Sequence, residues 1–183
     1  MPNPISTEKP LPVILVPHSK HWAHLAEAEI ARLTDLSAGA FSAIHHIGST
    51  SIPGIVAKPI VDLLAEAFSL EVLDAAEPRF TDAGYLWLGE FGIAGRRYLR
   101  RDAPVSGERL VHLHAFAAGS DEIARHLAFR DYLRAHPDVA SAYEAEKRRA
   151  AALHPLDSWA YTDEKEAWIK ATERRALKWW RAR

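Results

Sequence analysis

The stretch His46-Ile47-Gly48-Ser49-Thr50-Ser51-Ile52-Pro53-Gly54, followed by Lys58-Pro59-Ile60-Val61-Asp62-Leu63-Leu64, decides how this chain folds. It places the carboxylate of Asp62 inside an apolar strand. Burying a lone carboxylate is costly unless a cation, a metal or a set of hydrogen-bond donors compensates it, so Asp62 is expected to have a partner. The Gly-Ser turn between the apolar runs offers free backbone N–H groups, a setting that suits an anion. The stretch therefore predicts two core strands joined by a phosphate- or nucleotide-binding turn.

Outward from this stretch, apolar runs of period two alternate with helical patterns, and after residue 120 the pattern becomes helical throughout. The expected strands cover 41–47, 59–65, 85–88, 96–101 and 109–116, with a short edge strand at 13–16. The expected helices cover 19–33, 69–83, 120–136, 138–153 and 162–181, with Pro78 kinking or ending the second of them. The prediction is an α/β (α+β) fold, a mixed sheet with flanking helices and a C-terminal helical cap.

Length and composition limit the possible classes of protein. A chain of 183 residues with 48% hydrophobic and 26% charged residues fits one globular domain. We expect residues 1–12 to form a flexible N-terminal arm and residues 13–183 to form that domain. A formal net charge of −1 gives no global basic field for nucleic acid, so nucleic acid is a less favoured partner. The absence of cysteine and of a signal or membrane segment predicts a cytoplasmic protein without thiolate metal sites.

Several blocks, taken together, resemble one known family. The Gly-Ser turn followed by a strand Asp is the opening signature of the nucleotidyltransferase superfamily. Read with Gly92–Tyr98, His112-Leu113-His114 and His126–Arg134, the chain resembles the GrpB family from about residue 13 to residue 172. The resemblance implies a nucleotidyltransferase-like fold and no defined substrate. Family members fused to a dephospho-coenzyme-A kinase domain associate it with nucleotide-related metabolism.

An anion site is predicted around the turn. Its backbone donors and three hydroxyls suit a phosphate group, and the lysine and arginine side chains suit phosphate or carboxylate. The expected binding residues are Gly48, Ser49, Thr50, Ser51, Lys58, Arg96, Arg97 and Tyr98. Because Arg96 and Arg97 alternate along a strand, at most one of them belongs to the site, and Tyr98 shares the face of Arg96 and can stack on a base. The alternative is a tight turn that caps a short helix.

A metal site is the second prediction. Two-metal nucleotidyl transfer needs a second carboxylate two residues after Asp62, on the same face of the strand, and this chain has Leu64 there. His112 and His114 share a face of another strand and offer a substitute. With Asp62 they form a catalytic and metal-binding set for a divalent ion such as Mg²⁺, Mn²⁺ or Zn²⁺. The alternatives are an ion pair of Asp62 with Lys58, Arg96 or Arg97, and two histidines that only hydrogen-bond to their neighbours.

The predicted function follows from both sites. It is the binding of a phosphorylated small molecule or nucleotide, with metal-dependent group transfer as its catalytic form. The alternative is a non-catalytic nucleotide- or RNA-binding module that has lost the two-carboxylate metal site, and Leu64 favours it. A scaffold whose polar cluster only fixes the fold is the third reading. The sequence does not determine the oligomeric state.

Overall fold

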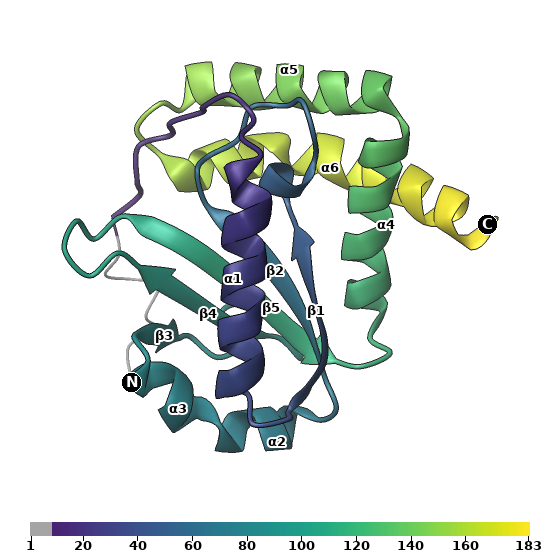
Figure 1. The fold of residues 1–183 in the computed structure, drawn as a ribbon. Helices are drawn as coiled ribbons and strands as arrows, with labels where there is room; N and C mark the ends of the chain where they lie inside the picture. Colours follow the sequence, from purple (N-terminus) through teal and green to yellow (C-terminus); the bar gives the residue numbers. More distant parts are fainter. Residues whose placement is uncertain (1–8) are drawn as a thin grey trace.

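The computed structural model describes residues 9–183. Its strands are β1 (Phe41–Ile47), β2 (Val61–Ala67), β3 (Tyr85–Trp87), β4 (Arg97–Asp102) and β5 (Arg109–Ala117). Its helices are α1 (His21–Leu36), α2 (Leu70–Ala75), α3 (Glu77–Asp82), α4 (Asp121–Ala135), α5 (Pro137–Leu153) and α6 (Ser158–Arg181), and a 3-10 turn, η2 (Ser49–Ser51), follows β1. This succession confirms the predicted α/β fold with a mixed sheet and a C-terminal helical cap (Figure 1).

The sheet has the order β1-β2-β5-β4-β3, and its mixed character comes from one pairing. Strands β2 and β5 are parallel, whereas β1 with β2, β4 with β5 and β3 with β4 are antiparallel. In the parallel register, Asp62 pairs with His112 and Leu64 pairs with His114. Residues that are two apart along a strand share a face. The register therefore brings the carboxylate and both imidazoles to one face of the sheet.

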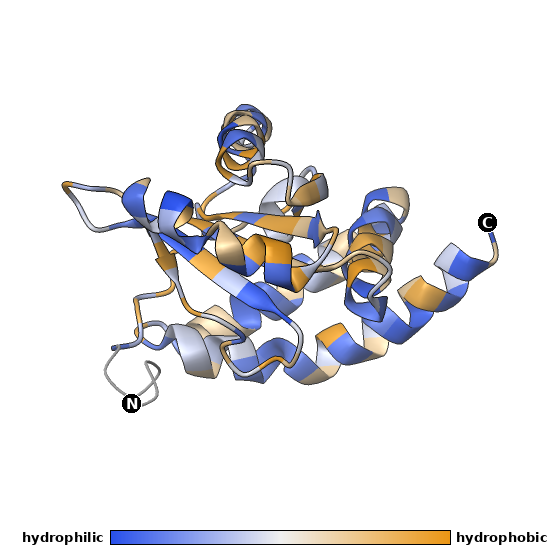
Figure 2. Cartoon of the chain, turned by 90° about the horizontal axis from the view of Figure 1, so that it is seen from below, coloured by the Kyte–Doolittle hydropathy of each residue, from blue (hydrophilic) through white to orange (hydrophobic). Residues whose placement is uncertain are grey.

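Helices cover both faces of the sheet. Helices α1, α2 and α3 bury one face over a core that includes Leu33, Leu63, Phe80, Leu99 and Leu113. On the other face, α4 closes a smaller cluster of Ile47, Leu64, Phe116 and Ile123. In Figure 1, α1 crosses the face turned to the viewer, and α6 runs behind the sheet. Figure 2 shows hydrophobic residues gathered on the central strands, whereas α6 is hydrophilic over most of its length.

The loop between η2 and β2 is packed beneath the helical cap. Ile52 and Ile55 of this loop join Leu133 of α4 and Tyr143 of α5 in a separate buried cluster. Arg130 of α4 forms an ion pair with Asp131 at 2.7 Å and donates to the carbonyl of His46 at 3.2 Å. The pair thus links α4 to β1. These contacts hold the turn after β1 against the helices that later complete the site.

Element boundaries differ from the prediction where backbone hydrogen bonds decide them. Strand β2 starts at Val61 and not at residue 59, because Ile60 N donates to Lys58 O in a turn at 2.8 Å. The predicted edge strand at 13–16 is a single bridge between Val16 and Ala57. The last helix begins at Ser158 and not at residue 162, because the Asp157 side chain accepts hydrogen bonds from the first turn. The helix predicted at 69–83 is split into α2 and α3 near Pro78, as expected.

The N-terminal segment reaches the start of α6. Residues 1–8 of the predicted arm lie outside the described residues, but Leu11 exchanges hydrogen bonds with Ser158. Val13 N also donates to Pro155 O at 2.8 Å. This segment therefore lies against the cap from residue 11 onward. Among residues 9–183, no helix combines the length and apolar character that crossing a bilayer requires.

Candidate functional site

Gly48 follows β1 and has a backbone conformation that only glycine adopts readily, with φ 68° and ψ −172°. Its neighbour Ile47 pairs with Asp62 across the antiparallel register, so the Asp62 side chain lies against the glycine. A Cβ at position 48 would lie 2.8 Å from the Cβ and 3.0 Å from the Cγ of Asp62, and closer still to Oδ2. Glycine at this position both permits the turn and makes room for the carboxylate.

Asp62 has His112 as its partner. The Oδ1 atom of Asp62 lies 3.0 Å from Nδ1 of His112, and an ionised carboxylate only accepts, so Nδ1 carries the hydrogen. Burial raises the pKa of Asp62, but the hydrogen bond from His112 and the nearby positive charge of Lys58 act against it, and the pKa lies below its ordinary value. The half-buried carboxylate is therefore compensated by a hydrogen bond from His112 and by the nearby Lys58.

Both imidazoles of β5 are turned toward arginine side chains. Arg109 Nη1 lies 3.3 Å from Nε2 of His112, and Arg96 Nη1 lies 3.3 Å from Nδ1 of His114. A guanidinium has donors only, so each of these ring nitrogens presents its lone pair to an arginine. Burial and the neighbouring His126 also lower the pKa of His114 well below its usual range. His114 is thus a neutral hydrogen-bond acceptor toward Arg96.

A metal ion held by Asp62, His112 and His114 does not fit this arrangement. A ligating imidazole must offer a lone pair. One nitrogen of His112 donates to Asp62, and arginine donors occupy the acceptor nitrogens of both histidines. Within residues 9–183, no group of three or more His, Cys, Asp or Glu side chains is placed to hold an ion. Leu64 is fully buried in the core at the position of the missing carboxylate, so these residues do not form the site predicted for Mg²⁺, Mn²⁺ or Zn²⁺.

Two predicted binding residues have structural roles instead. Arg97 points to the face covered by α2, where its Nε and Nη2 bind both oxygens of Asp74 at 2.5 and 2.7 Å. Adjacent residues of an extended chain point to opposite faces, so Arg97 faces α2 whereas the Arg96 side chain points to the other face of the sheet. Ser51 is 5% exposed and donates to the carbonyl of Gly48 at 2.7 Å, which closes the turn. The binding roles predicted for Arg97 and Ser51 are corrected accordingly.

A cavity of about 300 Å³ opens where the turn, the start of β2, β5 and the helices α5 and α6 meet, and we call it the lysine cavity. Asp62 is the one carboxylate in its lining. Predicted and unpredicted residues line it together: Gly48, Ser49, Thr50, Lys58, Ile60, Asp62, His112, Tyr143, Tyr161, Thr162 and Lys165. The geometry thus joins most of the predicted turn to residues of the helical cap.

The cations of the lysine cavity are crowded. Lys165 Nζ lies 3.9 Å and Lys58 Nζ lies 5.6 Å from the centroid of the Tyr161 ring. Burial and the charge of Lys58 lower the pKa of Lys165 to about 8, against the opposing charges of Asp62 and Glu146. Next to the cavity, Lys147 is almost wholly buried and donates to the carbonyl of Val56. Burial and the neighbouring charge of Lys165 lower the pKa of Lys147 to about 7. In the lining of the cavity itself, two lysines, Lys58 and Lys165, stand against one carboxylate, Asp62.

A second space of about 560 Å³ adjoins the lysine cavity, and we call it the aromatic chamber. The two share Lys58, Ile60, His112 and Thr162 as a common wall. The rest of the chamber is lined by Leu11, Pro12, Phe91, Ile93, Arg96, Tyr98, Arg100, Arg109, His114, Ser158, Trp159 and Asp163. The predicted residues Arg96 and Tyr98 therefore lie in this chamber, on the far side of His112 from the turn.

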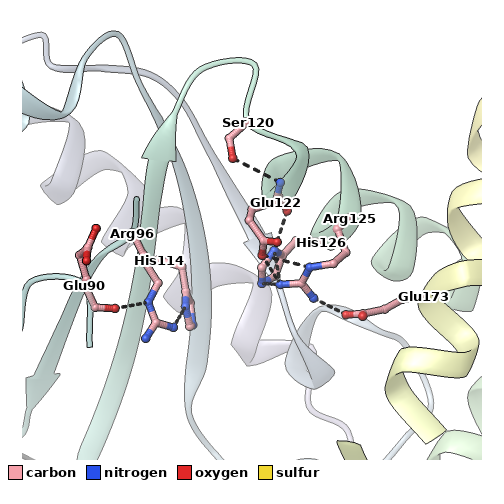
Figure 3. A network of polar contacts seen from close by, with 8 residues as sticks. All are labelled: Glu90, Arg96, His114, Ser120, Glu122, Arg125, His126 and Glu173. Carbon is pink, nitrogen blue, oxygen red and sulfur yellow. Dashed lines mark hydrogen bonds and ion pairs between the residues drawn. The ribbon is translucent and has the colours of Figure 1, made fainter. Parts of the chain in front are cut away.

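A polar network fixes the back of the aromatic chamber (Figure 3). Arg96 donates to the carbonyls of Glu90 and Phe91 as well as to His114, which holds the loop before β4 against β5. On α4, Arg125 bridges Glu122 of its own helix and Glu173 of α6. The rings of His114 and His126 lie 5.9 Å apart between these groups. Hydrogen bonds thus hold the loop before β4 against β5, an ion pair holds α4 against α6, and the rings of His114 and His126 lie between the two groups.

The chain is similar in sequence to proteins of one family. The sequence model of the family described as GrpB protein matches residues 12–175. The YqkA protein of Bacillus subtilis is 41% identical over 171 residues, covering 93% of this chain and 49% of that protein. The chain therefore spans about half the length of YqkA. The glutamate-rich protein GrpB of Alkalihalophilus pseudofirmus is 35% identical over 159 residues, covering 86% of this chain and 91% of that protein.

A solved structure agrees with these sequence relatives. The crystal structure of the conserved protein GrpB from Enterococcus faecalis matches with a TM-score of 0.84 at 38% sequence identity. The match covers 90% of this chain and 98% of that one. Fold and sequence thus point the same way, and the chain belongs to the GrpB family.

Proposed function

We propose that this protein binds the phosphate group of a phosphorylated small molecule, such as a nucleotide, in the lysine cavity. The observation that carries the proposal is the charge of the cavity. Lys58 and Lys165 line it, Lys147 lies beside it, and Asp62 is its one lining carboxylate. Like charges that share a buried space repel one another, and a bound anion relieves that repulsion.

The hydroxyl groups of the lining support the same ligand. Ser49 and the tyrosine side chains of α5 and α6 add polar groups to the lysines of the wall, whereas the Thr162 hydroxyl donates to the carbonyl of Ser158 at 2.9 Å. Phosphate oxygens accept several hydrogen bonds at once, and bonds to a charged group are the stronger ones. A cavity of about 300 Å³ has room for a phosphate with part of the molecule that carries it.

The geometry favours binding over two-metal transfer. The relation to the nucleotidyltransferase-like superfamily, which the Gly-Ser turn and Asp62 imply, is part of this proposal. Ordinary transfer in that superfamily needs two carboxylates on one strand face, and here Leu64 fills the second position. The lone pairs of His112 and His114 face arginines. We therefore propose the non-catalytic member of the two predicted alternatives, a binding module for phosphorylated ligands.

Inorganic phosphate should stabilise the protein, and Lys58→Met should remove this effect. With a Kd of about 0.1 mM, 10 mM phosphate would add about 2.7 kcal/mol to the free energy of unfolding. For a chain of this length that is a rise in melting temperature of roughly 5–10 °C. The measurement is a thermal unfolding series in phosphate, with sodium chloride at matched ionic strength as reference. Methionine keeps the packing of the Lys58 stem and removes its charge.

The matched control is Lys20→Met, which removes an exposed lysine at the start of α1, outside the lysine cavity. This variant should keep the full phosphate shift. An equal shift in the Lys58 variant and the wild type, or no shift in the wild type, would contradict the proposal.

Phosphate affinity should fall as the pH rises above about 8. Lys165, with a pKa of about 8, loses its charge in this range, and binding then requires uptake of a proton. The expected loss is roughly tenfold in affinity for each pH unit above 8. The stability of the unliganded protein, unlike its phosphate affinity, should increase as the pH rises. Between about pH 7 and the ordinary lysine value of 10.5, the unfolded chain holds protons that Lys147 and Lys165 have released, so its stability rises with pH.

Titration calorimetry with phosphate at pH 7, 8 and 9 measures the affinity, and Lys165→Gln is the informative variant. It should bind more weakly at pH 7 and lose most of the pH dependence. Lys170→Gln, an exposed change on the same helix where Lys170 pairs with Glu166, should behave like the wild type. A wild-type affinity that stays constant from pH 7 to 9 would show that Lys165 does not contact the anion.

A further inference from the structure

We infer that the aromatic chamber holds the planar base of a nucleotide whose phosphate occupies the lysine cavity, with Trp159 as the stacking surface that determines specificity. This inference rests on the proposed function, because the phosphate anchors the ligand. It narrows the ligand from any phosphorylated small molecule to a nucleoside phosphate.

The first support is the aromatic lining of the chamber. Trp159 lies at the start of α6 with 44% of its surface exposed, and it lines the chamber. Phe91 and Tyr98, from the loop before β4 and from β4 itself, line it too and stack on one another at 5.2 Å and 26°. The Tyr98 ring is only 8% exposed and is covered by Phe91 and Arg96, so Trp159 supplies the open ring face. Large aromatic rings with an open face are the usual surface for a nucleobase, since every base offers a π face.

The second support is the shared wall between the two spaces. His112 and Thr162 face both the lysine cavity and the aromatic chamber, so a ligand can extend past them without crossing the sheet. The chamber, at about 560 Å³, is the larger of the two and suits a base with its ribose. A sugar phosphate without a base would leave this apolar and aromatic surface in contact with water.

The third support is the fixed position of the chamber walls. Leu11 N donates to the hydroxyl of Ser158, the residue before Trp159, and Leu11 O accepts from Ser158 N, which ties the N-terminal segment to the start of α6. In the loop before β4, Arg96 lies 4.9 Å over the Tyr98 ring and is held by three hydrogen bonds. Rings in fixed positions lose little freedom when a ligand binds, which favours affinity.

Three probes separate the phosphate from the base: inorganic phosphate, ribose 5-phosphate and adenosine 5′-monophosphate. Titration calorimetry should show that Trp159→Ala weakens binding of the nucleotide about tenfold, as removal of one stacking ring does. Binding of ribose 5-phosphate and of inorganic phosphate should stay at the wild-type value. Trp159→Phe, which keeps a ring, should restore most of the nucleotide affinity. Leu156→Ala, a change at a 73% exposed side chain that lines neither space, is the matched control.

The outcomes distinguish this inference from the proposed function. If Lys58→Met removes binding of all three probes while Trp159→Ala leaves the nucleotide unaffected, the phosphate site stands and the aromatic chamber is not a base site. If ribose 5-phosphate and the nucleotide bind the wild type equally well, the inference is also overturned. If none of the probes binds the wild-type protein, both proposals fail together. Melting temperatures of all variants verify that each one is folded.

Discussion

Gly48→Ala should lower the free energy of unfolding by about 4 kcal/mol, the largest effect we expect from a single methyl group in this protein. Two costs add up. An alanine at φ 68° and ψ −172° has a strained backbone, at about 1–3 kcal/mol. Its Cβ would also lie 2.8 Å from the Cβ of Asp62, and such overpacking costs about 1–3 kcal/mol. Urea denaturation measures the change in the midpoint and the slope.

Gly54→Ala separates the two costs. Gly54 also has a positive φ, of 81°, but no atom lies within 4 Å of the position that a Cβ would take. In this variant the free energy of unfolding should fall only by the cost of the strained backbone, about 1–2 kcal/mol. In a double variant, the combined loss from Gly48→Ala and Asp62→Ala should be less than the sum of the two single losses, because the Oδ2 and Cγ contacts of Asp62 disappear. Equal losses in the two glycine variants would show that the carboxylate does not press on Gly48.

Asp62→Asn should lower the free energy of unfolding by about 3 kcal/mol, because it removes the negative charge from a partly buried cluster of cations. Asp62 raises the pKa values of Lys58, Lys147 and Lys165, so its loss leaves these lysines harder to hold in their charged form. The amide also loses the charge-assisted hydrogen bond from His112. Phosphate binding should persist or strengthen in this variant, since the anion takes over the compensating charge.

The pH dependence follows from the lowered pKa of Asp62. A carboxyl group with a lower pKa in the folded state stabilises the protein above its unfolded value, near 3.8, and loses this contribution as the pH falls through the folded value. The difference in the free energy of unfolding between the wild type and Asp62→Asn should therefore be largest at neutral pH and should shrink below about pH 4. Denaturation curves between pH 3 and pH 7 measure it.

Asp74→Asn is the matched control for this carboxylate. Asp74 forms an ion pair with Arg97 at 2.5 Å, but its side chain is 40% exposed on the opposite face of the sheet. Such a pair contributes little, so the loss should be below about 1 kcal/mol. A loss of phosphate binding in folded Asp62→Asn would contradict the role of Asp62 as a charge-balancing group.

The order of the helices and strands could be predicted from the sequence, because the hydrophobic periodicity and the capping, glycine and proline residues between the elements agree along most of the chain. The period-two pattern of 109–116 yields β5, and Ser120 caps α4 through its side chain. The exact ends of the strands and helices are harder to predict, because they depend on contacts between residues that are distant in sequence. The start of β2 depends on a turn at Lys58, and the segment near Val16 pairs with Ala57 through one bridge only. Local propensity does not report such pairings.

The part of the candidate site that comes from the Gly-Ser turn and the central strands could be predicted from the sequence. Gly48, Lys58, Asp62 and His112 come together as the pattern indicated. The residues that α5 and α6 contribute were not identified, since a sequence does not show which helix faces which cavity. A signal was present in Tyr161 and Lys165, a tyrosine and a lysine one helical turn apart. The arginine contacts of His112 and His114 depend on side-chain orientation, which alternation alone does not determine.

The parallel pairing of β2 with β5 also sets when the site can form during folding. Its contact between Asp62 and His112 joins residues 50 apart in the chain, whereas β3, β4 and β5 pair with neighbours in sequence. Long loops lose more entropy on closing, and such contacts form late. The cavity further requires α5 and α6, so it is complete only in a nearly native chain. Interactions absent from the folding transition state act on the unfolding rate, and a bound phosphate would therefore prolong the lifetime of the native state without accelerating its formation.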